Sequence, residues 1–146
     1  MNVWVPLAFA GGLGFGWLLS ARRRGAPRRG APPRPADFSH TIDLLRRAYG
    51  GRAAWAVGLA AGPLTAFDPT VPEDARRRGD ALVQLACVDG RVHVVREPSG
   101  TYVAVGDFPF GAGVLLPPET DPTAAGDDLR RVVAGMRVAE SVELRK

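Results

Sequence analysis

The sequence is poor in residues that catalyse reactions or bind metals. Its 146 residues include one cysteine and two histidines. A single cysteine cannot form an internal disulfide, which fits a reducing cytoplasm. The histidines, His40 and His93, lie far apart, and neither has a second His or Cys at the spacing of a zinc site. The glycine patterns of P-loops and dinucleotide-binding folds are also missing. We therefore expect no enzymatic activity, no catalytic residue, no metal site and no cofactor.

Three residues that could still carry chemistry have simpler interpretations. Cys87 ends an apolar segment, so we expect a buried, unreactive thiol. His93 alternates with two valines, which predicts that it lies on the less buried face of a strand. His40 lies near a predicted helix start, where we expect it to face solvent. None of the three is predicted to bind a ligand.

Lysine is almost absent, with Lys146 alone beside eighteen arginines, and the abundance of Arg, Gly and Pro indicates a GC-rich bacterial genome. The formal net charge of +4 is unevenly distributed, since residues 22–37 carry +5 and residues 38–146 carry −1. A basic segment of this kind favours anionic lipid head groups. A nucleic-acid-binding arm is the alternative, but we expect no nucleic-acid partner. The arginines expected to contact lipid are Arg22, Arg23, Arg24, Arg28 and Arg29.

The N-terminal segment carries no charge from Val3 to Ser20. As a helix, residues 2–21 would span about 30 Å, the thickness of a hydrocarbon core. Trp4 and Trp17 lie near its ends, as membrane-interface anchors do. A cleaved signal peptide is the alternative, but it needs positive charge before its apolar run. We predict one transmembrane helix in a bacterial cytoplasmic membrane, with the N-terminus outside and the domain in the cytoplasm.

Small residues recur every fourth position along this predicted helix. Such a face lets a neighbouring helix approach closely, and we expect it to pack against other membrane-protein subunits. The general frequency of glycine in membrane helices is the alternative explanation. The residues of the predicted packing face are Ala8, Gly12, Gly16 and Ser20.

Residues 22–37 are predicted to form an Arg/Pro-rich linker, and residues 38–146 are long enough for one small domain. Periodicity and turn signals predict its helices and strands. We expect helices over 37–49, over 72–89 and from Asp127 onward, and strands over 53–60, 91–96, 101–106 and 111–116. The acidic pairs Glu73–Asp74 and Asp127–Asp128 are explained by helix starts, where the helix dipole favours acids.

This order of elements predicts an α+β fold, with an antiparallel sheet and helices on one side of it. Pro98, Ser99 and Gly100 predict a hairpin turn between two of the strands. Apolar positions in the predicted elements give the expected core, which is Trp55, Val57, Leu82, Val94, Val103 and Leu115.

Residues 38–142 resemble a GAF domain, a small-molecule sensor fold. The likeness rests on the element order and on three segments, 89–95 (DGRVHVV), 102–105 (YVAV) and 111–116 (GAGVLL). The domain is short for that family, which implies a reduced ligand pocket. Cys87 is followed by Val88 and not by the His common in tetrapyrrole-binding members, so no ligand residue carries over. No output domain follows within the sequence, and the resemblance therefore implies either action through another chain or a domain that has stopped sensing.

We expect a non-catalytic, membrane-anchored accessory subunit of a multi-subunit bacterial membrane complex, without a small-molecule substrate. The GAF-like domain would hold the cytoplasmic faces of its neighbours together. A bioenergetic assembly, such as a photosynthetic reaction centre with its light-harvesting complex, is the best candidate. The alternative is a membrane-tethered GAF-type sensor that signals through a separate output protein. A basic tether for anionic lipid is a third possibility.

Overall fold

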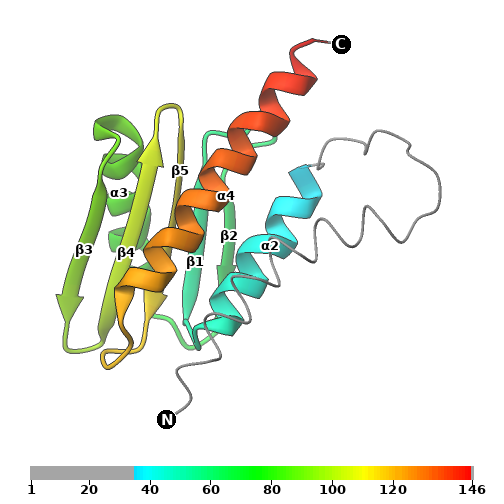
Figure 1. The fold of residues 1–146 in the computed structure, drawn as a ribbon. Coiled ribbons are helices and arrows are strands. Elements are labelled where there is room, and N and C mark those ends of the chain that lie inside the picture. The colour runs from blue at the N-terminus through cyan, green and yellow to red at the C-terminus, as the bar shows by residue number, and fades with distance from the viewer. Residues whose placement is uncertain (1–34, 146) are drawn as a thin grey trace. The chain divides into compact units, whose positions relative to one another are not determined.

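The computed structural model describes residues 35–145, which form three helices and five strands. Figure 1 shows their arrangement. Along the chain they are α2 (Pro35–Ala48), β1 (Ala53–Val57), β2 (Leu64–Phe67), α3 (Glu73–Asp89), β3 (Val92–Glu97), β4 (Gly100–Asp107), β5 (Phe110–Leu116) and α4 (Pro122–Glu143).

All five strands belong to one antiparallel sheet, in the order β2-β1-β5-β4-β3. Two hairpins, β3–β4 and β4–β5, build one half of the sheet from consecutive strands. The other half is the β1–β2 hairpin, which joins the first half where β1 pairs with β5. The strands β2 and β3 are therefore the two edges.

Helices cover both faces of the sheet (Figure 1), with α2 and α4 on one face and α3 on the other. The larger core lies under α2 and α4, and includes Ile42, Leu45, Leu129 and Met136. The smaller core lies under α3 and is built around Trp55 and Tyr102. Each helix contributes one apolar stripe, and the strands alternate their side chains between the two cores.

Glycines bring α3 unusually close to the sheet. The indole ring of Trp55 occupies the place that a side chain at Gly79 would need. Gly106 of β4 likewise lies against the carbonyl group of Ala86, so that a Cβ there would overlap the helix backbone. The close approach of α3 to β1 thus depends on Gly79, and its close approach to β4 depends on Gly106.

Local signals explain where α3 and α4 begin and end. α3 begins with Glu73 and Asp74 in its first turn, where the helix dipole favours acids, and ends at Gly90 with φ 67°. At the start of α4, the carboxylate of Asp121 accepts a hydrogen bond from the Thr123 N–H at 3.0 Å, and Pro122 follows it.

Several sequence predictions are confirmed and others are wrong. The antiparallel α+β domain, the hairpin through Pro98 and Ser99, and the limits of α3 are confirmed. The prediction of helices on one side only is wrong, because α3 covers the opposite face. The strand β2 was not predicted, and α4 begins at Pro122 and not at Asp127. α2 begins at Pro35, inside the predicted linker.

The predicted core is correct for four residues, correct in part for Leu82, which packs against the core under α3, and wrong for Val94. Trp55, Val57, Val103 and Leu115 are buried. Leu82 is only half-buried, and Val94 is 45% exposed because it lies on an edge strand. The predicted membrane helix, its packing face and the lipid-contacting arginines lie outside the described residues. Within residues 35–145, no helix is both long enough and apolar enough to cross a membrane.

Candidate functional site

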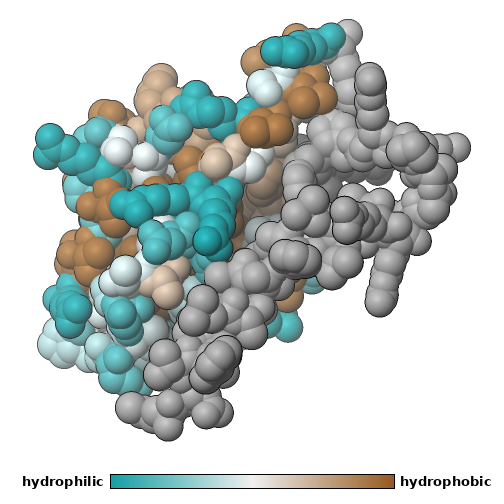
Figure 2. All heavy atoms as spheres, in the orientation of Figure 1, coloured by the Kyte–Doolittle hydropathy of each residue, from teal (hydrophilic) through white to brown (hydrophobic). Residues whose placement is uncertain are grey.

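The edge strand β3 is the most unusual surface of the domain. It pairs with β4 along one side, and no described strand pairs with its other side. An open strand edge presents unpaired backbone N–H and C=O groups, and proteins normally protect it with charge or a covering element. Here three valines on β3 are exposed instead, namely Val92, Val94 and Val95. Figure 2 shows hydrophobic side chains reaching the surface along this edge.

The register with β4 assigns the side chains of β3 to two faces. Val92 and Val94 lie opposite Val105 and Val103, which belong to the core under α2 and α4. His93, Val95 and Glu97 alternate with them and therefore lie on the α3 face. The face toward α4 thus carries two exposed valines, and the face toward α3 carries one, Val95, between His93 and Glu97.

Two polar contacts fix α3 against β3. Arg78 pairs with Glu97, and Nε2 of His93 lies 2.8 Å from Oδ2 of Asp89. Asp89 also accepts a hydrogen bond from the Arg91 N–H at 2.9 Å. Desolvation opposes ionisation of Asp89, but the bonds from Arg91 and His93 outweigh it and lower the pKa of this carboxyl group. The edge strand and the helix beside it therefore form one rigid surface.

The side of α3 that faces β3 continues the apolar surface. Leu85 lies on the same helical stripe as Arg78 and Asp89, which both contact β3. Leu85 is 50% exposed and Val88 beside it is 72% exposed. We call the set of Leu85, Val88, Val92, Val94 and Val95 the apolar edge. Leu85, Val88 and Val95 lie on the α3 side of this edge, and Val92 and Val94 lie on its opposite face. Several exposed apolar residues along one edge make it a candidate interaction site.

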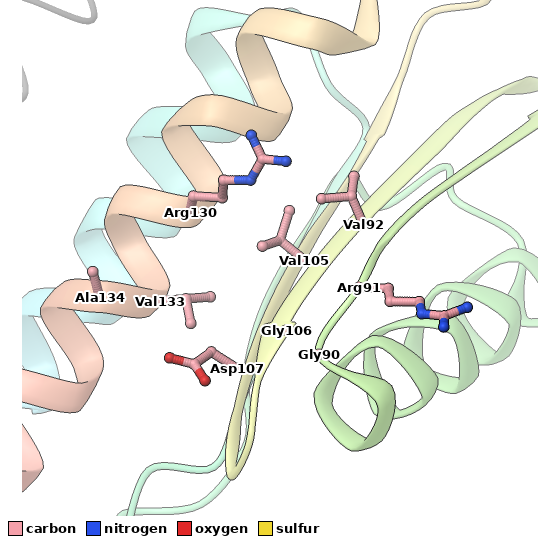
Figure 3. A pocket seen from close by; sticks show the side chains of 9 residues that line it. All are labelled: Gly90, Arg91, Val92, Val105, Gly106, Asp107, Arg130, Val133 and Ala134. Atoms are coloured by element: carbon pink, nitrogen blue, oxygen red, sulfur yellow. The ribbon is translucent and has the colours of Figure 1, made fainter.

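A shallow groove runs along the other face of this edge, between β3 and α4 (Figure 3). It measures about 600 Å³, and its apolar walls include Val92, Val105 and Val133. Arg130 of α4 extends over it, and Asp107 lies at one end. No described side chain of α4 bonds to β3, so that the groove stays open.

The residues considered for chemistry have structural partners. Cys87 is buried, its thiol donates to the carbonyl oxygen of Pro109 at 3.0 Å, and burial raises its pKa. The predicted unreactive thiol fits this environment. His93 is less exposed than its valine neighbours, so its predicted place on the less buried face is wrong. His40 is exposed, as predicted. Within residues 35–145, no group of three or more His, Cys, Asp or Glu is placed to bind a metal ion.

The predicted acidic pairs have different roles. Glu73 and Asp74 lie in the first turn of α3, as expected. Asp128, by contrast, is buried inside α4, where it accepts hydrogen bonds from Tyr49 and Arg131. Asp127 stays exposed and pairs with Arg130. The bond between Tyr49 and Asp128 joins the end of α2 to α4, whereas the contacts of Arg131 and Arg130 lie within α4.

The fold of the described domain resembles those of several solved structures. The described domain superposes on MglB from Myxococcus xanthus with a TM-score of 0.52 and 10% sequence identity, over 73% of this chain and 98% of that one. A Roadblock/LC7 domain from Streptomyces avermitilis matches with a TM-score of 0.49 and 16% identity, over 68% and 94% of the two chains. The gliding protein MglB from Thermus thermophilus matches with a TM-score of 0.47 and 19% sequence identity, over 77% of this chain and 93% of that one. No family model and no curated protein sequence matches this chain.

These similarities correct the predicted family and function. The resemblance to a GAF domain is wrong, because the solved structures that match this fold are MglB and Roadblock/LC7 domains and not GAF domains. The predicted accessory subunit of a bioenergetic or photosynthetic complex, and the alternative GAF-type sensor, are overturned with it.

Sequence reasoning missed the apolar edge. The segment Arg91–Arg96 was predicted as a strand with Val94 in the core and His93 on its less buried face. The position of β3 at the edge of the sheet depends on pairings far along the chain, which the local pattern does not contain.

Proposed function

We propose that the domain is a non-catalytic protein-interaction module, and that two copies associate through β3 and the adjoining side of α3. The observation that carries this proposal is the apolar edge, where open backbone groups and exposed valines coincide. Pairing with another strand satisfies the backbone groups and buries the valines at once. The fold shared with MglB is compatible with such a module but does not by itself establish it.

A second copy fits this edge because the edge is self-complementary. A two-fold axis perpendicular to the sheet would make the two β3 strands antiparallel and keep both α3 helices on one face. Residues that lie opposite each other would then be on the same face of the joined sheet. The open edge of one copy would become the pairing partner of the other, and a continuous ten-stranded sheet would result.

Charge limits the possible registers of this pairing. If the axis passes through Val94, Glu97 lies opposite Arg91 of the second copy; if it passes through Val95, Glu97 lies opposite His93. Either register places valine against valine and an acid against a basic group, which favours cross-strand pairing. An axis through Arg96 would instead place two guanidinium groups opposite each other. We therefore expect an axis through Val94 or Val95.

The absence of catalysis is part of the proposal. Cys87 is buried and its pKa is raised, so its thiolate, the reactive form, is disfavoured. The imidazole of His93 is engaged with Asp89, on the side of β3 that faces α3.

Sedimentation velocity of the full-length chain tests the proposal, in whichever buffer or detergent keeps it in solution. The wild-type chain is expected to form dimers. Val88→Glu and Val95→Glu place a charge on the apolar edge and should give monomers with unchanged circular dichroism. Val138→Glu is the matched control, because Val138 is also exposed but lies on α4, away from this edge.

Oxidative cross-linking of cysteine variants tests the register. Directly opposed residues of antiparallel strands have Cα atoms about 4.5–5.5 Å apart, which a disulfide can bridge. Val94→Cys or Val95→Cys should cross-link two chains efficiently, whereas Val138→Cys should not. A monomeric wild-type chain, or dimers that persist in both glutamate variants on the edge, would refute the proposal.

A further inference from the structure

Three large apolar side chains are exposed at one end of the domain, away from the apolar edge. They are Phe108, Val138 and Leu144, which are 68%, 56% and 86% exposed. Among the described side chains, every other large apolar one that is exposed belongs to the apolar edge. We call these three residues the α4 tip, because Val138 lies near the end of α4 and Leu144 is its C-cap. Figure 2 shows hydrophobic side chains on the surface at this end of α4.

The turn between β4 and β5 brings Phe108 to the end of α4. Arg137 of α4 donates a hydrogen bond of 2.7 Å to the carbonyl oxygen of Phe108, and Val138 is the next residue along the helix. Val138 faces away from the sheet, because Met136 and Ala139 on either side of it are buried in the core under this helix. The α4 tip therefore lies at one end of the layer formed by α2 and α4.

The chain enters the domain at the same end. Phe38, near the start of α2, lies against Gly135 of α4, whereas Tyr49, after the end of α2, bonds to Asp128 near the start of α4. The two helices are therefore antiparallel, as Figure 1 shows. Pro35, the first residue of α2, lies beside the C-terminal half of α4 and thus on the side of the α4 tip.

The sequence before α2 indicates what lies near this entry point. Residues 2–21 are the predicted membrane helix, and the thirteen residues 22–34 separate it from α2. Thirteen residues span at most about 45 Å, whatever their conformation. A domain anchored in this way stays close to the bilayer, at an effective concentration on the order of millimolar, so that even a weak contact with the lipid surface forms.

The surroundings of the α4 tip do not oppose such a contact. Asp107 pairs with Arg137 at 2.9 Å, and the carboxylate of Glu140 accepts a hydrogen bond of 2.8 Å from the Ala60 N–H. Ala60 belongs to the loop after β1, residues 58–63 (GLAAGP), which carries no charge. Both acids thus have partners within the protein, and the loop beside them adds no charge that would repel anionic lipid.

We infer that the α4 tip rests on the surface of a lipid bilayer, with its three apolar side chains at the level of the head groups and α3 on the aqueous side. This inference rests on the membrane helix predicted from residues 2–21, and it does not require the association through β3. Exposed Phe and Leu side chains are typical of protein surfaces that lie in the membrane interface, and they gain free energy by leaving water. A lipid surface is the occupant because the chain enters the domain at this same end.

The proposed pairing of two copies is compatible with this placement. A two-fold axis perpendicular to the sheet keeps both layers of α2 and α4 on one face of the joined sheet. Both chains would then enter the same bilayer, which would lie parallel to the sheet, and both α3 helices would face the aqueous side.

Fluorescent probes on the full-length chain test the inference. The chain is reconstituted into vesicles of phosphatidylcholine and phosphatidylglycerol, and single cysteine variants carry the environment-sensitive dye NBD. Val138→Cys reports on the α4 tip, and Arg77→Cys, on the exposed side of α3, is the matched control. Lipids with a nitroxide in the upper acyl chain should quench the dye at position 138 at least twice as strongly as at position 77. The wild-type chain treated with the dye measures any labelling of Cys87, which is buried.

Charge substitutions then test which residues make the contact. Phe108→Glu combined with Val138→Glu should at least halve the quenching of a dye attached to Leu144→Cys, because charged side chains disfavour the apolar part of the interface. Val88→Glu, on α3, is the matched control and should leave this quenching unchanged. The same control separates the two copies in the proposed dimer, so it shows whether the contact with lipid depends on association.

The possible results separate this inference from the association through β3. A full-length chain that does not float with the vesicles, or equal quenching at positions 77 and 138, would overturn the inference. So would quenching at position 144 that is insensitive to the double substitution. A dye at position 138 with blue-shifted emission but no quenching by the nitroxide lipids would mean that protein, and not lipid, covers the α4 tip. A chain that is monomeric in sedimentation, yet quenched at position 138, would refute the association and support the contact with lipid.

Discussion

The hydroxyl group of Tyr49 donates a hydrogen bond of 2.6 Å to the buried carboxylate of Asp128. The two residues are separated by 79 positions in the sequence, and their contact joins the end of α2 to α4. The guanidinium group of Arg131 also pairs with this carboxylate, with Nη1 of Arg131 lying 3.0 Å from Oδ1 of Asp128. A buried carboxylate needs such partners, because an unpaired one is costly. This contact therefore holds the two helices of the larger core together.

Tyr49→Phe should lower the free energy of unfolding by about 1–2 kcal/mol, because Asp128 stays buried with one partner fewer. Urea denaturation followed by circular dichroism measures the effect. The same variant also tests pH dependence. Desolvation, and then the bond to Asp128, raise the pKa of Tyr49 well above its ordinary value of 10.

The sign of this pH dependence follows from the raised pKa. The neutral phenol stabilises the folded state, so the contribution is complete below pH 10 and is lost as the pH rises further. Wild-type stability should fall above pH 10 more steeply than that of Tyr49→Phe. Parallel curves for the two proteins would show that Tyr49 does not titrate with folding.

Two glycine substitutions of identical chemistry should have opposite effects. Gly106→Ala places a methyl group on the backbone of Ala86, and should cost about 1–3 kcal/mol through overpacking. Gly126→Ala, within α4, makes an ordinary contact with Val103 and should gain about 0.5–1 kcal/mol of helix propensity. Thermal unfolding compares them. A stable Gly106→Ala variant would mean that α3 can move away from the sheet at little cost.

Arg137 holds the turn between β4 and β5. Its guanidinium group bonds the Asp107 carboxylate and the carbonyl oxygens of Asp107 and Phe108, at 3.0, 3.1 and 2.7 Å. Arg137→Lys keeps the charge but loses the fork of donors. We expect it to lower stability by about 1 kcal/mol and to speed amide exchange in the turn. Arg77→Lys, on the exposed surface of α3, is the control and should change neither quantity.

Asp121 should make the start of α4 sensitive to acid. The backbone N–H of Thr123 bonds its carboxylate and lowers its pKa below 3.8. A lowered pKa in the folded state means that the stabilisation is present above about pH 4 and is lost as the pH falls below it. Asp121→Asn keeps the cap without the charge, so the difference in melting temperature between wild type and this variant should shrink in acid. A difference independent of pH would contradict this role.

The sequence predicted those elements whose signals are local. The acids and glycine that bound α3, and the turn residues Pro98 and Ser99, act on neighbouring backbone, and their effects were found where expected. β2 was missed because its four residues are too few to show periodicity. The start of α4 was misplaced because the acids at Asp127 and Asp128 resemble a first turn, while the true cap is Asp121.

The candidate site was harder to predict, for a different reason. Whether Val94 is buried depends on what lies over β3 and beside it, and these are facts about the order of strands in the sheet. The local pattern of an apolar strand does not show whether the strand lies at the centre of a sheet or at its edge. The predicted membrane helix, residues 2–21, and the lipid-contacting arginines stay predictions.

The helix and the strand of the apolar edge follow one another directly, separated by a turn at Gly90. Residues 73–97 thus encode nearly the whole proposed contact surface as one uninterrupted stretch of chain. Mutations that alter partner choice can accumulate within this stretch while the hydrophobic residues of α2, β5 and α4 stay unchanged. Exchanging residues 73–97 between two proteins of this fold should therefore transfer the partner preference of one protein to the other.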